Sequence, residues 1–355
     1  MASKEKNRYI ELLRFIFCII IVLHHSGFVS ENGNGLFPSG GIIADAFFML
    51  TGYFACAHIV KMNSLPEKPM KYSVVYTIKK LIRVLPFSAF GVVIIYLLEL
   101  VQSNGQTSFS DVMHRLYYMI VEILLLPMAG IINTDLTSFK NAPLWYLSAV
   151  MIALPLVMYV SMKCKDLFSH YLVWFLPLIL QGYMVTVFGG ALPWMSHIGI
   201  VSSGVIRGIS SLTMGFGIYY ATKLLEKRAT KYSNSYRVIL TILEIGLFIM
   251  VIANLLYGVS GYDEIGCIYL IYIMLILTLS GATYTSRINV KAFEYLGVIS
   301  MPIYCIHWGI YRWVSAYFGY LNYRSGVILT LTLCIVASIV LIIIYDNAGK
   351  RINRN

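Results

Sequence analysis

Long apolar stretches, separated by short polar connections, recur along the whole chain. About 20 mostly apolar residues are enough for a helix to cross the hydrocarbon core of a bilayer. Eleven stretches approach this length, and they lie at residues 10–29, 41–61, 84–101, 112–130, 143–161, 170–188, 207–223, 237–257, 266–284, 296–316 and 327–346. The pattern predicts an all-α protein built as a bundle of transmembrane helices.

Composition supports a membrane protein and excludes two other classes. Of the 355 residues, 59% are hydrophobic and 12% are charged, whereas a soluble domain has about 25% charged residues. The net charge of +11 is not gathered in a basic domain or a nucleic-acid-binding motif, so we expect a lipid bilayer and no nucleic acid as partner. The connections are too short to bury a core. We therefore expect residues 1–355 to form one membrane domain with no fused soluble domain.

The basic residues predict how the chain is threaded through the membrane. Cytoplasmic connections are rich in Lys and Arg; the N-terminal tail carries three, residues 30–40 none and residues 61–83 six. If residues 112–130 also crossed, the next basic connections would lie outside, so we predict an interfacial or re-entrant segment there, which also suits its His114, Arg115 and Glu122. Ten spanning helices remain, with both termini cytoplasmic, and this arrangement places 21 of the 27 Lys and Arg inside.

Neither the cysteines nor the first apolar stretch indicates a special function. The six cysteines stand singly, with no CxxC and no Cys/His spacing of a zinc site, so we interpret them as core residues and expect no metal. The first apolar stretch is too long for the hydrophobic region of a cleaved signal peptide, and no A-x-A site follows it. We interpret it as a retained signal anchor.

The first predicted helix carries ionisable side chains within RYIELLRFIFCIIIVLHHSG, residues 8–27. Such groups are functional candidates because the hydrocarbon penalises them. Arg14 and His25 are eleven residues apart, which puts them on one helix face about 16 Å apart, with His24 about 100° away. This face would suit a long anionic ligand. Alternatively, Arg14 reaches the cytoplasmic headgroups and the histidines lie in the outer interface.

The second predicted helix begins with GGIIADAFFMLTGYFA and places Asp45 about one turn below the outer surface. A carboxylate beside an imidazole fixes its tautomer and favours its protonated form, as a general base requires. We therefore predict that His25 and Asp45 form a catalytic pair. Alternatively, Asp45 is a helix N-cap after the turn made by Gly40 and Gly41.

A basic cluster, IKKLIRVLP, precedes the third predicted helix. Its side chains, Lys79, Lys80 and Arg83, would suit phosphate groups, although basic residues are also expected at any cytoplasmic helix end.

Three further residues are candidates for a substrate or supporting role. Trp145 in APLWYLSAV is at the predicted outer interface, where an aromatic belt is the ordinary explanation. Arg207 in VIRGISSL lies near the outer end of its helix, and His307 in ISMPIYCIHWGIYRW lies near the middle of the bilayer. A buried histidine can serve catalysis or a hydrogen bond between helices.

Taken in order, these stretches resemble the acyltransferase-3 family of integral-membrane acyltransferases, which modify bacterial cell-surface carbohydrates. The resemblance runs from about Arg8 to about Asp346. It rests on RYIELLR with its spacing to His25, GGIIADAFFMLTGYF, KKLIRVLP, PLWYLS and ISMPIYCIH. The acidic residue usual before the first-helix arginine is matched by Glu11, one position out of register.

The resemblance implies a ten-helix enzyme of the bacterial cytoplasmic membrane. It would move an acyl group, most often acetyl, from acyl-CoA to a hydroxyl of a lipid-linked or surface saccharide. The family's first-helix arginine and histidine correspond to Arg14 and His25, and its basic cluster to Lys80 and Arg83, with Lys in place of the first arginine. CoA phosphates would then bind Arg14, Lys80 and Arg83, and the thioester would lie near His25.

Two other functions are compatible with the residues. A transporter or flippase of an anionic lipid-linked substrate would use Arg14, Arg207 and Arg312 along its path. A purely structural membrane scaffold would need none of these charges and would tolerate Leu at position 14.

Overall fold

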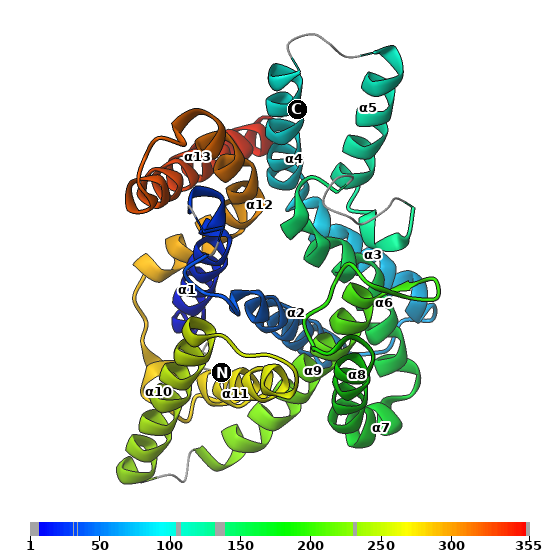
Figure 1. Ribbon diagram of the computed structural model, residues 1–355. Helices are drawn as coiled ribbons and strands as arrows, with labels where there is room; N and C mark the ends of the chain where they lie inside the picture. The colour runs from blue at the N-terminus through cyan, green and yellow to red at the C-terminus, as the bar shows by residue number, and fades with distance from the viewer. Residues whose placement is uncertain are drawn as a thin grey trace.

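The computed structural model describes residues 7–30, 32–33, 35–103, 108–131, 139–229 and 233–352. The N-terminal lysines that help to predict a cytoplasmic terminus, Lys4 and Lys6, lie outside these residues. The described chain is almost entirely helical (Figure 1). Its α-helices are α1 (Tyr9–His24), α2 (Ile43–Val60), α3 (Pro69–Ile82), α4 (Leu85–Gln102), α5 (Phe109–Ile123), α6 (Trp145–Lys163), α7 (Lys165–Leu167), α8 (Val173–Phe188), α9 (Ser203–Ala229), α10 (Asn234–Tyr257), α11 (Tyr262–Leu279), α12 (Ala292–Phe318) and α13 (Tyr323–Ile352).

Short elements complete the described chain. The strands β1 (His197–Ile198) and β2 (Val201–Ser202) pair antiparallel between α8 and α9. Single turns of 3₁₀ or π-helix are η1 (His25–Val29), η2 (Gly40–Ile42), η3 (Pro127–Ala129), η4 (Ala142–Leu144), η5 (Phe168–Leu172) and η6 (Thr285–Arg287).

The predicted all-α polytopic class is confirmed. Among the described residues, eight helical stretches are long and apolar enough to cross a membrane: Tyr9–Val29, Gly40–Val60, Leu85–Gln102, Ala142–Lys163, Lys165–Phe188, Asn234–Tyr257, Tyr262–Leu279 and Tyr323–Asn347. α9 and α12 are not among them, although each is 27 residues long and each coincides with a predicted span. Ten spans and cytoplasmic termini stay predictions. Below, the inner end of the bundle is the one predicted to be cytoplasmic, and the outer end is the opposite one.

Helix α2 runs through the centre of the bundle and packs most extensively on α9 (Figure 1). Two glycines let these backbones meet: a Cβ on Gly52 would lie 2.1 Å from the Leu212 carbonyl oxygen, and one on Gly215 would lie 2.2 Å from that of Met49. Small residues allow such close approach between helices in a membrane. Side chains on α2 are therefore held against α9 within narrow limits.

The other helices surround this pair. α1 packs on α12, which also contacts α4 and α13, while α6 and α8 pack on α9. α3 lies on α6, and α10 pairs with α11. Most of the buried apolar side chains in the described residues belong to one continuous core.

Helix α5 packs mainly on α4 and stands away from the bundle (Figure 1). It has 15 residues and is not among the candidate spans, in keeping with the prediction for residues 112–130. Its Glu122, predicted to be interfacial, is fully buried. The Glu122 carboxylate accepts hydrogen bonds from the Tyr96 hydroxyl (3.1 Å) and from the backbone N–H groups of Lys140 (2.8 Å) and Asn141 (3.0 Å). α5 thereby fixes the segment that leads into α6.

Candidate active site

His25 forms a hydrogen-bonded pair with His307 where α1 ends. His25 Nδ1 lies 3.0 Å from His307 Nε2, and His307 Nδ1 lies 2.7 Å from the backbone oxygen of Tyr304. A carbonyl oxygen can only accept, so His307 Nδ1 carries a proton, and in the neutral ring Nε2 is then an acceptor. His25 Nδ1–H must therefore be the donor of the next bond. The neutral His25 ring is left with a free lone pair on Nε2, as a base or nucleophile needs.

Aromatic rings hold the two histidines in place. The His25 and His307 rings stack with centroids 5.1 Å apart, and Trp308 meets His25 edge-on at 5.0 Å. His307 is fully buried on α12, whereas His25 is partly exposed. His307 can thus orient His25 without itself reaching a ligand.

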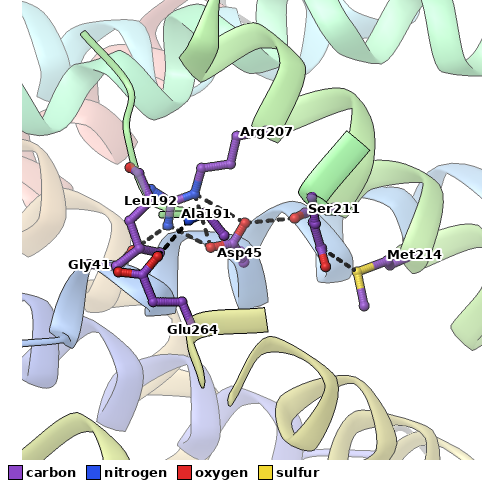
Figure 2. A network of polar contacts seen from close by, with 9 residues as sticks. Gly41, Asp45, Ala191, Leu192, Arg207, Ser211, Met214 and Glu264 are labelled. Carbon is purple, nitrogen blue, oxygen red and sulfur yellow. Dashed lines mark hydrogen bonds and ion pairs between the residues drawn. The ribbon is translucent and has the colours of Figure 1, made fainter. Parts of the chain in front are cut away.

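The predicted contact between Asp45 and His25 is wrong. Asp45 faces α9 and binds Arg207, with Arg207 Nε 3.2 Å from Oδ1 and Nη2 2.5 Å from Oδ2 (Figure 2). The Ser211 hydroxyl also donates to Asp45 Oδ1 at 2.6 Å. The sequence interpretation paired Asp45 with the histidine at the same depth, but a fixed cation on α9 competes more strongly for a buried carboxylate.

Each nitrogen of the Arg207 guanidinium group donates a hydrogen bond. Besides Asp45, it donates from Nη2 to the Gly41 carbonyl (2.6 Å) and from Nη1 to the Leu192 carbonyl (2.8 Å). Its guanidinium carbon lies 5.1 Å from the centroid of the Trp145 ring. The arginine therefore ties α9 to the start of α2 and to the connection after α8 (Figure 2).

A cavity of about 160 Å³ lies at the outer end of the bundle and joins these groups. It is lined by His25, Trp145 and Arg207, so three of the predicted site residues do meet in one space. His24 lines it as well, although the helical spacing predicts that it faces elsewhere. The reason is local: α1 ends at His24, His25 begins a 3₁₀ turn, and the two rings lie 4.8 Å apart.

Two tryptophans form one wall of this outer cavity. Trp145 stacks on Trp194 with ring centroids 5.8 Å apart and an interplanar angle of 15°. Trp145 is buried, so the explanation as a lipid-facing aromatic belt residue is wrong. The sequence analysis missed Trp194, which lies in the connection between α8 and α9, where no motif marked it.

A narrow space, called the constriction below, adjoins the outer cavity at Tyr304. It encloses only about 10 Å³ between Arg14, Phe47, Tyr146 and Tyr304, with Ser300 and Met301 beside them. Tyr304 lines both the constriction and the outer cavity, and its hydroxyl donates to the Pro143 carbonyl. Arg14 is bound to Glu11 at 2.7 Å. Arg14 therefore lines the constriction, whereas His25 lines the outer cavity.

A basic cavity of about 460 Å³ lies at the inner end, between the end of α2 and α3. The predicted cluster Lys79, Lys80 and Arg83 lines it, together with the aromatic rings of His58, Tyr72 and Tyr76. Burial, with the nearby charges of Arg14 and Arg83, lowers the pKa of Lys80 from 10.5 to about 8. The influence of Arg14 on Lys80 indicates that this cavity lies close to the constriction.

The outer cavity and the constriction share Tyr304, whereas the basic cavity shares no lining residue with either of them. A model of a family described as an acyltransferase domain matches residues 7–346. A comparison with curated proteins and one with solved structures gave no match. Since the match covers nearly the whole chain, this protein belongs to the acyltransferase-3 family and is a multi-pass membrane acyltransferase.

Proposed function

We propose that the protein is an O-acyltransferase that moves an acyl group, with acetyl the first choice, from acyl-CoA to a hydroxyl of a cell-envelope saccharide. The main support for the proposal is the series of hydrogen bonds that fixes the tautomer of His25. The Tyr304 carbonyl and His307 leave the Nε2 lone pair free on a histidine that lines the outer cavity. A nitrogen prepared in this way suits a base that removes a proton from a hydroxyl.

The donor would bind from the inner end. CoA carries phosphate groups and a flat adenine ring, and the basic cavity offers Lys79, Lys80 and Arg83 beside the rings of Tyr72 and Tyr76. Its pantetheine arm is long and uncharged, which suits the path past Arg14 toward His25. The constriction is too small for this arm, so Tyr146 and Tyr304 must rotate when the donor binds.

The acceptor would bind in the outer cavity. The C–H faces of sugar rings are apolar and their hydroxyls are polar, which matches the stacked Trp145 and Trp194 beside Arg207. A lipid-linked sugar and a surface glycan both fit this chemistry. The enzyme would then work in the bacterial cytoplasmic membrane, with donor and acceptor on opposite sides.

Besides the acyl donor and the acceptor hydroxyl, the chemical step needs only one base. His25 Nε2 takes the proton of the acceptor hydroxyl, the oxygen attacks the thioester carbonyl, the C–S bond breaks, and the proton passes to the CoA thiolate. In the alternative route, Nε2 attacks the thioester carbonyl and the C–S bond breaks to release CoA thiolate; the acceptor oxygen then attacks the acyl-imidazolium, the C–N bond breaks, and the hydroxyl proton passes to the thiolate. His307 acts as a positioning residue in both routes, because it holds Nδ1 of His25.

Paired charges count against the transporter alternative. Each arginine predicted to mark its path is bound to a carboxylate: Arg14 to Glu11, Arg207 to Asp45, and Arg312 to Glu99 at 3.3 Å. An anion moving along them would have to displace a carboxylate at each step. This pairing favours the enzyme.

The test uses the purified protein in lipid nanodiscs with acetyl-CoA labelled in the acetyl group and a bacterial envelope glycan extract. The wild type should transfer label to the glycan, and His25→Ala should lose at least about 100-fold of the rate while remaining folded. His114→Ala is the matched control, because His114 is exposed on α5 and lines none of the three cavities described above.

Two results would contradict the proposal. One is transfer by His25→Ala at the wild-type rate. The other is the absence of CoA-dependent labelling by the wild type across the glycans supplied. Mass spectrometry of the product identifies the acyl group and its carrier together.

A further inference from the structure

A second cavity, of about 700 Å³, lies at the inner end of the bundle. Four residues at the end of α2 and just after it, Tyr53, Phe54, Ala57 and Lys61, line this second cavity, whereas His58 lines the basic donor cavity. Positions i, i+3 and i+7 share one helix face, and His58 is turned about 100° from Ala57. The end of α2 is therefore a wall between two separate cavities.

Four basic side chains from four different segments meet in this second cavity. They are Lys61 after α2, Lys223 on α9, Arg237 on α10 and Arg287 in η6. Like charges brought together at a partly buried site repel one another unless an anion joins them.

The carboxylates of the cavity already have cationic partners. Glu11 binds Arg14 at 2.7 Å, and Arg14 is not a lining residue. Glu226 binds Lys223 at 2.9 Å. Lys61 and Arg287 are exposed, and among the described residues neither forms an ion pair. The second cavity thus keeps a surplus of positive charge.

We propose that the second cavity binds a phosphate-bearing ligand that is distinct from the acyl donor. Arg and Lys together recognise phosphate oxygens, the guanidinium in a fork and the ammonium as a point charge. The volume lies within the range of about 300–1,000 Å³ of small-molecule sites. Apolar side chains, among them Ile10, Phe54 and Leu279, form part of the wall, so the ligand combines a phosphate ester with an apolar part. An anionic phospholipid headgroup and a soluble organic phosphate both have this chemistry.

The test is a binding measurement on the full-length protein with saturating CoA, which fills the donor cavity. One arm adds inorganic pyrophosphate to protein in phosphatidylcholine nanodiscs. The other arm compares nanodiscs with and without phosphatidylglycerol, and bound lipid is counted by native mass spectrometry. The variant is Lys61→Gln/Arg287→Gln, which changes two exposed side chains. Its control is Lys163→Gln/Lys165→Gln, which removes two exposed charges at the same inner end outside all four cavities.

We expect the Lys61/Arg287 variant to bind pyrophosphate or phosphatidylglycerol at least tenfold more weakly than the wild type and the control, with unchanged CoA affinity. A response to pyrophosphate alone would identify a soluble phosphate, and a response to phosphatidylglycerol alone a headgroup. Equal binding by all three proteins, or no binding of either probe by the wild type, would overturn the proposal. Loss of CoA binding in the variant would also overturn it, because the second cavity would then be the donor site. A wild type that binds a probe but not CoA contradicts the proposed function and leaves this site standing.

Discussion

Replacing Asp45 by Asn should cost stability rather than chemistry. The substitution keeps the side-chain volume but removes the charge that neutralises Arg207, whose side chain is only 4% exposed. The backbone carbonyls of Gly41 and Leu192 still hold the guanidinium in place, so the cation stays buried without its counterion. Breaking a buried ion pair in this way costs about 3–5 kcal/mol. We expect a loss of this size in the free energy of unfolding.

The assay is reversible unfolding in mixed micelles, followed by helical circular dichroism. Ser211→Ala provides a smaller reference, because it removes one hydrogen bond to the same carboxylate, worth about 1.5–3 kcal/mol. Asp45→Asn/Arg207→Gln removes both charges and should recover part of the loss. His25→Ala should lose acyl transfer and cost about 1–3 kcal/mol, because the buried Nε2 of His307 loses its hydrogen-bond donor. An Asp45→Asn protein that stays within about 1 kcal/mol of the wild type but transfers no acyl group would refute this reasoning and restore Asp45 as a partner of His25.

Three further predictions concern other parts of the protein. Gly52→Ala should destabilise the protein by about 1–3 kcal/mol or more, because the new Cβ meets a backbone oxygen at 2.1 Å; Gly246→Ala, with no atom within 4 Å, should raise helix stability by about 0.5–1 kcal/mol in the same unfolding assay. Because burial lowers the pKa of Lys80 to about 8, its charge is present below pH 8 and lost above it. The KM for acyl-CoA should therefore rise above pH 8 in the wild type and stay constant in Lys80→Arg. A wild-type KM that does not change with pH would contradict this. Glu122→Gln should place an amide N–H against a backbone N–H, which costs about 1–3 kcal/mol of local stability. We expect faster hydrogen exchange at the backbone amides of Lys140 and Asn141. Unchanged exchange there would show that α5 does not hold that segment.

Apolar length and basic flanks were enough to predict the long apolar helices of this fold, whereas α3 (Pro69–Ile82) was not among the predicted stretches because it is short and rich in polar residues. The charge pattern also predicts that α5 does not span the membrane, because a span there would put later basic connections on the outer side, and α5 has only 15 residues. Lys79, Lys80 and Arg83, which lie within five residues at the end of α3, do line one cavity.

The same reasoning could not predict which helices contact one another. Asp45 and Arg207 are 162 positions apart, and nothing in the local pattern says that α2 crosses α9 at Gly52 and Gly215. The face of His24 was predicted wrongly, because the α-helix gives way to a 3₁₀ turn one residue later. Trp194 could not be singled out, since a tryptophan in a connection is ordinary until its neighbour is known.

The small volume of the constriction beside Tyr304 bears on how well the membrane retains its ion gradients. If donor and acceptor bind on opposite sides, as proposed, the enzyme needs a passage between them, and an open passage filled with water would let protons and ions leak. The space of about 10 Å³ beside Arg14 holds at most about one water molecule. In that case the aromatic side chains would close the passage between turnovers, and substitution of Tyr146 and Tyr304 by Ala together should make vesicles containing the protein permeable to protons.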